Sequence, residues 1–330
     1  AEITSDRVGW HKDNFLLPQT INGVRFEKEL QGYGAKGERE KELRLLKEVI
    51  EEGSLLGIGY LASVGAMLIE PLEVRNFIIF LTGTSGSGKT TTSALGLSLL
   101  GDYNTLLKGM NLTAVGLEIL LKKNRDVLVV LDELNTAKDL TQAINVIYHF
   151  HQGIGRVRAN TRLNLRDVAE YRGILMLTAE NDLNQILEQS DSIVRGALRR
   201  VLSFEYTEKI EREWIEKVYE TISNNYGNLI KEIVDYIKAS KEEIKINYKA
   251  YVKELSEKYG FGDGLEMYLA VLLTALEILG NLYNLNIGIM IANLIRLAKA
   301  YKEEIKDELN LTREKIEERI TQFVLDNKQN

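Results

Sequence analysis

The stretch "NFIIFLTGTSGSGKTTT", residues 76–92, decides the fold expected for this chain. An apolar run over Phe77–Leu81 leads into a glycine-rich turn, and the helix-compatible "SALGLSLL" follows it. A glycine-rich turn between a strand and a helix surrounds a phosphate with backbone N–H groups and the positive end of the helix. The stretch therefore predicts a phosphate-binding loop.

The turn fits the pattern G-x-x-x-x-G-K-[ST] over Gly83–Thr90. In this pattern the lysine, here Lys89, reaches the β- and γ-phosphates, and the hydroxyl of Thr90 binds Mg²⁺. A chance glycine loop is the alternative, and the flanking strand and helix argue against it. We predict ATP and Mg²⁺ as cofactors. The expected nucleotide-binding residues are Gly83, Thr84, Ser85, Gly86, Ser87, Gly88, Lys89, Thr90 and Thr91.

A second apolar segment, Val127–Leu131, ends in Asp132 and Glu133. A carboxylate at a strand tip suits Mg²⁺, so Asp132 joins Thr90 as a predicted metal residue. The adjacent Glu133 projects to the other side, where it can polarise a water for attack on the γ-phosphate. The pair favours hydrolysis over transfer to a metabolite. A solvated acid at a helix start is the alternative for Glu133.

Two further segments end or begin with polar residues. The expected strand Ile174–Thr178 is followed by further polar residues in "TAEN", residues 178–181. We expect Thr178 to lie between the first two motifs and to sense the γ-phosphate. The alternative is that Thr178 or Asn181 caps a helix. Arg199 and Arg200 directly precede the strand Val201–Tyr206. Arginines at a helix end also suit the helix dipole without any further role.

A cluster of arginines follows the second motif, in "GRVRANTRLNLRDVAEYRG", residues 155–173. The segment predicts a β-hairpin whose arginines contact DNA phosphates. A solvated surface hairpin is the alternative. The candidate DNA-binding residues are Arg156, Arg158, Arg162 and Arg166.

The pattern of strands and helices predicts an α/β fold with a mostly parallel sheet. At 330 residues the chain is long enough for more than one unit. We expect an N-terminal leader (1–70), an ATPase core (71–206) and a C-terminal helical domain (207–330). The expected strands are Phe77–Leu81, Thr105–Leu107, Val127–Leu131, Ile174–Thr178 and Val201–Tyr206.

Composition narrows the class of protein. The absence of cysteine excludes disulfides and thiolate metal sites, and the net charge of −6 argues against wholesale coating of nucleic acid. The longest apolar stretch, residues 267–295, is interrupted by Glu277 and by asparagines, so we expect two buried helices and no membrane span. A cytoplasmic location is expected.

In order and spacing, "GTSGSGKTT", "LTAVGLEILLKKNRDVLVVLDEL", "GIGRVRAN" and "ILMLTAEN" resemble the helicase-like ATPase domain of phage, plasmid and mobile-element replication proteins. That group is similar to the superfamily 3 helicases within the AAA+ ATPases. The resemblance covers roughly residues 5–206 well and the later helices only loosely. It implies an ATP-driven hexameric ring that translocates on DNA, often fused to or encoded beside a primase.

Carried over by position, the resemblance implies that Lys89 and Thr90 bind nucleotide and Mg²⁺, and that Asp132 and Glu133 are the metal and water residues. It places Thr178 at the γ-phosphate-sensing position and Arg200, or else Arg199, at the arginine finger. The chain departs from the family at "LTAEN", where an asparagine is usual, so Thr178 and Asn181 both remain candidates.

The expected function is ATP-dependent DNA unwinding or translocation in the replication of a mobile element. Two alternatives remain. One is an AAA+ ATPase that loads or remodels other replication proteins, such as a primase or polymerase, without unwinding. The other is a DNA-binding assembly module whose ATP site only stabilises a ring.

Overall fold

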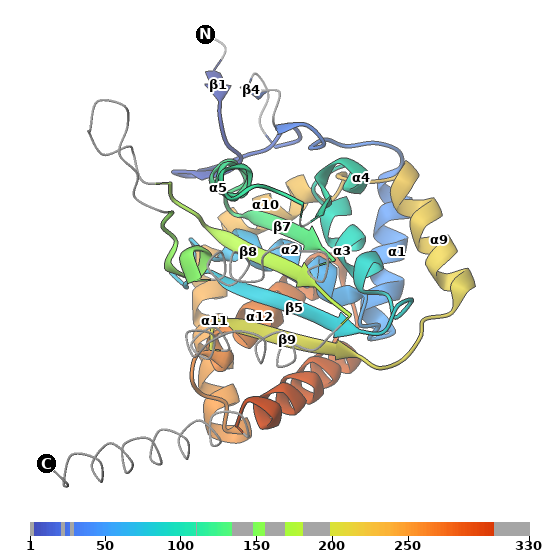
Figure 1. The fold of residues 1–330 in the computed structure, drawn as a ribbon, viewed down its shortest axis with the longest axis vertical. Helices are drawn as coiled ribbons and strands as arrows, with labels where there is room; N and C mark the ends of the chain where they lie inside the picture. Colours follow the sequence, from blue (N-terminus) through green and yellow to red (C-terminus); the bar gives the residue numbers. More distant parts are fainter. Residues whose placement is uncertain are drawn as a thin grey trace, which may run out of the picture.

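A computed structural model describes residues 3–20, 24–26, 30–109, 111–133, 148–155, 169–180 and 199–306. At its centre lies a five-stranded sheet in the order β6-β7-β8-β5-β9, with every neighbouring pair parallel. The strands are β5 (Phe77–Gly83), β6 (Lys108–Gly109), β7 (Val127–Asp132), β8 (Gly173–Thr178) and β9 (Val201–Tyr206). The arrowheads of β7, β8, β5 and β9 point the same way in Figure 1. The predicted α/β class is confirmed.

The strands are apolar runs because both faces of the sheet are covered. Side chains of β5 alternate between two hydrophobic clusters: Phe77, Ile79 and Leu81 belong to one, and Ile78 and Phe80 to the other. The first cluster includes α2 (Gly57–Leu68), α3 (Lys89–Ser98) and α12 (Leu265–Tyr283). The second includes α5 (Ala114–Lys123) and the helical residues 148–152. Helices on both faces thus hold the strand ends in fixed positions.

Helix α2 is buried along its whole length, which explains its uniformly apolar sequence. It packs against α3 so closely that a Cβ on Gly59 would lie 1.9 Å from the backbone oxygen of Thr92. Only glycine permits this approach. Helix α2 therefore fixes the position of α3, the helix that follows the glycine-rich loop.

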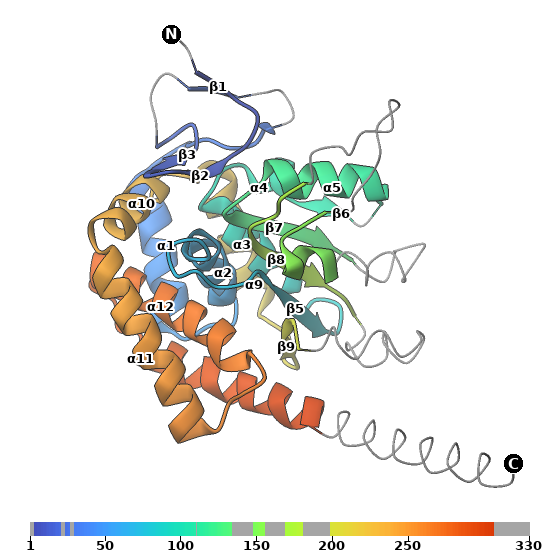
Figure 2. The same cartoon turned by 90° about the vertical axis from the view of Figure 1, so that its left-hand side faces the viewer.

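The remaining helices surround this core. The C-terminal helices lie together on one side of the sheet in Figure 2, and α12, long and apolar enough to span a membrane, is mostly buried among them, as in a core helix. This burial agrees with the expectation of buried helices. The other helices are α1 (Arg39–Glu51), α4 (Tyr103–Leu106), α9 (Arg212–Asn224), α10 (Ile230–Ala239) and α11 (Lys241–Tyr259), and residues 288–306 are also helical.

Short strands form the N-terminal part: β1 (Ile3–Ser5) pairs with β4 (Val24–Phe26), and β2 (Gly9–His11) pairs with β3 (Asn14–Leu16). Asp126, fully buried, ties this part to the sheet because its Oδ2 accepts a 2.8 Å hydrogen bond from the backbone N–H of Trp10. The Arg172 guanidinium also pairs with Asp126. One hydrophobic cluster runs through the N-terminal, central and C-terminal parts, and the boundaries predicted between them remain predictions.

One expected strand is wrong. Thr105–Leu107 was predicted to be a strand, but residues Tyr103–Leu106 form the short helix α4, and only Lys108–Gly109 pair with β7. The reason is a local cap. Asp102 accepts hydrogen bonds from the backbone of Asn104 and the hydroxyl of Thr105, which satisfies the helix N-terminus.

Candidate functional site

The carboxyl ends of β5, β7 and β8 meet at one edge of the sheet, where ligands of open α/β sheets bind. Because β8 lies between β5 and β7, its last residue, Thr178, lies between the glycine-rich loop and Asp132. A pocket of about 460 Å³ opens here. Its lining residues are Ser85, Gly86, Ser87, Gly88, Lys89, Thr90, Thr91, Asp132, Glu133, Thr178, Ala179, Glu180 and Ile215.

The loop needs glycine at its two ends. Gly83 has φ 134°, and a Cβ there would lie 2.3 Å from the backbone oxygen of Tyr206. Gly88 has φ 98° immediately before α3, and a Cβ there would meet Ile210. Both are conformations that other residues rarely adopt. The glycines at these positions in the sequence pattern therefore have a direct steric cause.

Lys89 points back into the loop. Its Nζ donates hydrogen bonds to the backbone oxygens of Gly83, at 2.6 Å, and Thr84, at 2.9 Å. Burial lowers the pKa of Lys89, while the charges of Glu180 and Asp132 act in the opposite direction. A cation held by carbonyl dipoles inside the loop is well placed to receive an anionic phosphate.

Asp132 is the centre of a small hydrogen-bond network. The hydroxyl of Thr90 donates to its Oδ2 at 3.2 Å, and the hydroxyl of Thr178 donates to its Oδ1. The same Thr178 oxygen accepts a 2.9 Å hydrogen bond from the backbone N–H of Glu133. Thr178 thus links the carboxyl ends of β7 and β8.

The donor set fits a hard divalent cation. Thr90 and Asp132 bring a hydroxyl and a carboxylate oxygen within 3.2 Å of each other, and oxygen ligands of this kind suit Mg²⁺. Glu133, next to Asp132, has φ 61°, an uncommon backbone conformation for a residue other than glycine. It lines the same pocket as the metal candidates. The structure therefore brings together the predicted nucleotide, metal and water residues, whose roles remain proposals.

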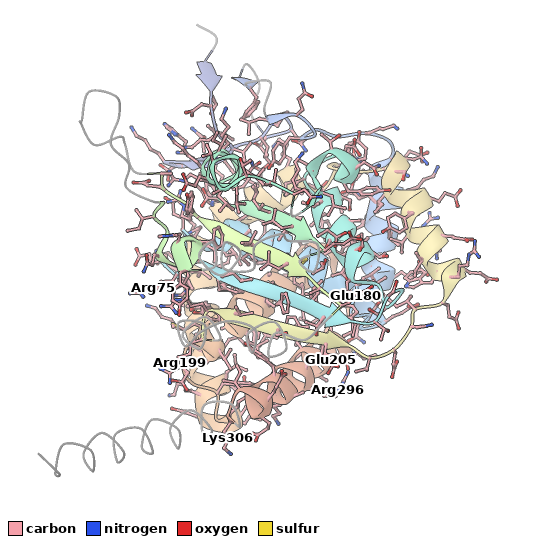
Figure 3. All side chains as sticks on the ribbon, in the orientation of Figure 1. Arg75, Glu180, Arg199, Glu205, Arg296 and Lys306 are labelled. Carbon is pink, nitrogen blue, oxygen red and sulfur yellow. The ribbon has the colours of Figure 1, made fainter. Side chains whose placement is uncertain are left out.

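Arg199 and Arg200 lie elsewhere. The backbone oxygen of Arg200 accepts from the N–H of Ile78, so Arg200 is level with the start of β5, whereas the loop begins at the other end of that strand. Figure 3 shows Arg199 and Glu180 at opposite ends of the sheet. The length of β9, six residues, corresponds to roughly 20 Å. Neither arginine reaches the pocket of its own chain.

The two arginines have different surroundings. The guanidinium carbon of Arg200 is 4.3 Å from the centre of the Tyr148 ring, a cation–π contact. Arg199 is exposed and lies 3.8 Å from Asp263. The Tyr148 ring fixes the direction of Arg200 more firmly than a solvated ion pair fixes Arg199. The DNA candidates Arg156, Arg158, Arg162 and Arg166, and also Asn181, lie outside the described residues.

Three residues that line the pocket are absent from the predicted site: Ala179, Glu180 and Ile215. Glu180 lies two residues after the end of β8, in "TAEN", so a polar residue at this position was a usable signal in the sequence. Ile215 lies on α9, more than a hundred residues from the loop in sequence, and its helix carries no motif. Only the packing of α9 beside α3 brings it to the pocket. The pocket thus includes an apolar side chain that the motifs did not indicate.

A family model described as a domain of unknown function, DUF927, matches residues 1–170, just over half of the 330-residue chain. The chain belongs to the DUF927 family. The matched part of this DUF927 protein includes the glycine-rich loop, Asp132 and Glu133, whereas Thr178 and Arg200 lie beyond it. A search of curated proteins returned no match.

Among solved structures, the DUF927 chain is similar to one titled "SCCmec type IV Cch - active helicase", with a TM-score of 0.75 and 20% identity over 98% of this chain. This similarity establishes a shared fold. The chain spans 64% of that protein's length. Two other matches, to the C-terminal region of NrS-1 (TM-score 0.34, 14% identity, 87% of this chain and 79% of that one) and to a DNA replication initiation factor (0.26, 13%, 82% and 91%), superpose too poorly to support an argument.

Proposed function

We propose that this DUF927 chain is an ATP-hydrolysing motor of the AAA+ class that translocates on or unwinds DNA during replication of a mobile element. The observation that carries the proposal is the network around Asp132, in which Thr90 and Thr178 both donate to one carboxylate beside Lys89 and Glu133. Such an arrangement suits hydrolysis because the water residue and the metal residues face one pocket.

In this proposal each side chain has a distinct task. Lys89 and the loop N–H groups bind the β- and γ-phosphates, and Glu133 accepts a proton from the attacking water. Thr90 and Asp132 hold Mg²⁺, which neutralises charge on the phosphate oxygens. Thr178 holds the carboxylate of Asp132 and the backbone of Glu133 in fixed positions relative to each other, because its hydroxyl forms hydrogen bonds with both.

The proposal includes a ring, with six copies as the expected number. Arg200 lies too far from the pocket of its own chain, so any contact with ATP has to come from a neighbouring copy. An arginine supplied across a subunit boundary stabilises charge on the transferring phosphoryl group. The resemblance to superfamily 3 proteins is the reason to expect this assembly. A linked primase belongs to the proposal because the replication proteins that this chain resembles are often fused to a primase or encoded beside one.

Two measurements test the function together. ATP turnover should rise on addition of single-stranded DNA, and a forked duplex should be unwound in the presence of ATP and Mg²⁺. DNA-stimulated turnover without strand displacement would favour the loader, and DNA binding without turnover would favour the assembly module. Absence of both turnover and DNA binding would contradict the motor proposal.

A further inference from the structure

Two charged side chains stand at opposite edges of the sheet without an ion-pair partner in the described part of the chain. Arg75, two residues before β5, is exposed. Glu180, two residues after β8, is exposed and lines the pocket. Figure 3 shows the two side chains at opposite ends of the sheet. Glu180 acts electrostatically on Lys89 in the same pocket, but neither Arg75 nor Glu180 forms an ion pair within the described residues.

They cannot pair within one copy. Leu81 is in register with Thr178, so Glu180 is level with Gly83, whereas Arg75 precedes Phe77, the first residue of the same strand. The separation along the strands is eight residues, from 75 to 83, which is roughly 26 Å at the rise of a β-strand. Two extended side chains do not close such a gap.

The surroundings of the two residues carry opposite charge. Arg75 lies two residues before β5 and Arg200 directly before β9, so both are at the amino ends of the strands. Burial lowers the pKa of His151, and the positive charges of these two arginines lower it further. At the other edge, Glu180 shares the pocket with Asp132 and Glu133, against the single cation Lys89 among the pocket-lining residues. Two arginines thus lie at one edge, while acids outnumber cations among the residues that line the pocket at the other.

We infer that Arg75 of one copy pairs with Glu180 of the next copy in a head-to-tail assembly of this chain. Head-to-tail association joins two different surfaces, as a contact between Arg75 of one copy and Glu180 of another needs, and it repeats around a ring. The inference rests on the ring of the proposed function and adds a contact beside each nucleotide pocket. The neighbouring copy then completes the rim of the pocket with a cation, so assembly and nucleotide binding involve the same edge.

Charge reversal tests the pair without reference to hydrolysis. Self-association of the whole chain is measured by sedimentation velocity, without DNA or nucleotide, for wild type, Arg75→Glu, Glu180→Arg and the double variant. Each single reversal should weaken association about tenfold or more because it places like charges opposite each other. The double variant should recover most of the loss, since the pair is restored with its signs exchanged.

The matched control reverses two exposed charges elsewhere, Arg44→Glu on α1 and Glu257→Arg on α11, with the same change in net charge. These variants should associate as wild type does. A monomeric wild type, single reversals that associate normally, or losses that merely add in the double variant would each overturn the inference. If a monomer hydrolyses ATP and DNA stimulates the turnover, the interface is wrong but the hydrolytic function is supported. If the double reversal restores association but no variant hydrolyses ATP, the interface is supported and the hydrolytic function is wrong.

Discussion

The hydroxyl of Thr178, at the end of β8, donates a hydrogen bond to the carboxylate of Asp132, at the end of the neighbouring strand β7. The same hydroxyl accepts from the N–H of Glu133. One side chain therefore holds the two acidic residues of the second motif. If these acids act on a bound nucleotide, Thr178 controls their placement more than it controls affinity.

Thr178→Val should lower kcat for ATP by at least about tenfold while changing KM little, because valine keeps the shape of the side chain and removes only its hydrogen bonds. Thr178→Ser keeps the hydroxyl and is the control; it should retain most of the activity. Steady-state ATPase assays measure both. Equal kcat in Thr178→Val and wild type would show that the link between the strands has no part in turnover.

Substitution of Lys89 and substitution of Glu133 should impair ATP turnover in different ways. Lys89→Ala should lose nucleotide affinity as well as turnover, because the cation inside the loop disappears. Glu133→Gln should still bind ATP but hydrolyse it at least ~100-fold more slowly, since only the proton acceptor is lost. Binding of a fluorescent ATP analogue and single-turnover hydrolysis separate the two effects. Normal turnover in Glu133→Gln would remove that residue from the mechanism.

Arg200 should act on the nucleotide of a neighbouring copy. Arg200→Ala and Lys89→Ala should each be inactive, but mixing them should recover activity, because some interfaces then join an intact loop to an intact arginine. The effect of a trans arginine reaches ~10³-fold or more. ATPase activity is measured across mixing ratios, with Arg199→Ala in place of Arg200→Ala as the comparison. Mixed assemblies that never exceed the inactive parents would contradict the trans role.

Arg162 lies outside the described residues, and the sequence predicts that it contacts a phosphate of the DNA backbone. Arg162→Ala should lower the slope of the salt dependence of DNA binding by roughly 0.7 to 0.9, as expected for the loss of one phosphate contact. Basal hydrolysis should persist, whereas DNA stimulation and unwinding should fall together. Salt-titrated binding is compared with that of Arg44→Ala, which removes an exposed arginine from α1. Overlaying curves for all three proteins would place the DNA contact elsewhere.

A buried glutamate should make stability depend on pH. Glu42 on α1 is 2% exposed, and burial raises its pKa to about 7, although Asn228 donates hydrogen bonds to it. Since the folded-state pKa lies above the unfolded value, the contribution of Glu42 to stability is fully present below pH ~4.5 and is lost as the pH rises through ~7. The loss is at most about 3 kcal/mol, from the size of the shift.

Glu42→Gln cannot ionise, so its stability should fall less than that of wild type between pH 5 and pH 8. Urea unfolding midpoints at the two pH values measure the difference. Glu40→Gln changes an exposed residue of the same helix and should follow the wild type. Parallel pH profiles for wild type and Glu42→Gln would show that the buried carboxyl does not determine this dependence.

The sequence by itself determined the local parts of the site. The glycine-rich loop, the apolar strands and the acids of "LDEL" are short-range patterns, since each depends on neighbours within a few residues: glycine at positive φ, apolar side chains for a sheet buried on both faces, carboxylates directly after a strand. The one wrong strand prediction also has a local cause: Asp102 caps a short helix at this position, and the sequence interpretation did not consider that cap.

The combination of these parts depends on long-range packing. The strand order β7-β8-β5 places Thr178 beside Asp132, and this order cannot be deduced from the spacing of the motifs along the chain. The arrival of Ile215 at the pocket follows from the packing of α9, and the placement of Arg75 and Arg200 at the far edge follows from the parallel direction of the strands. Parallel strands put all their carboxyl ends at one edge and all their amino ends at the other. This geometry gathers the predicted nucleotide residues at one edge and places Arg75 and Arg200 at the other.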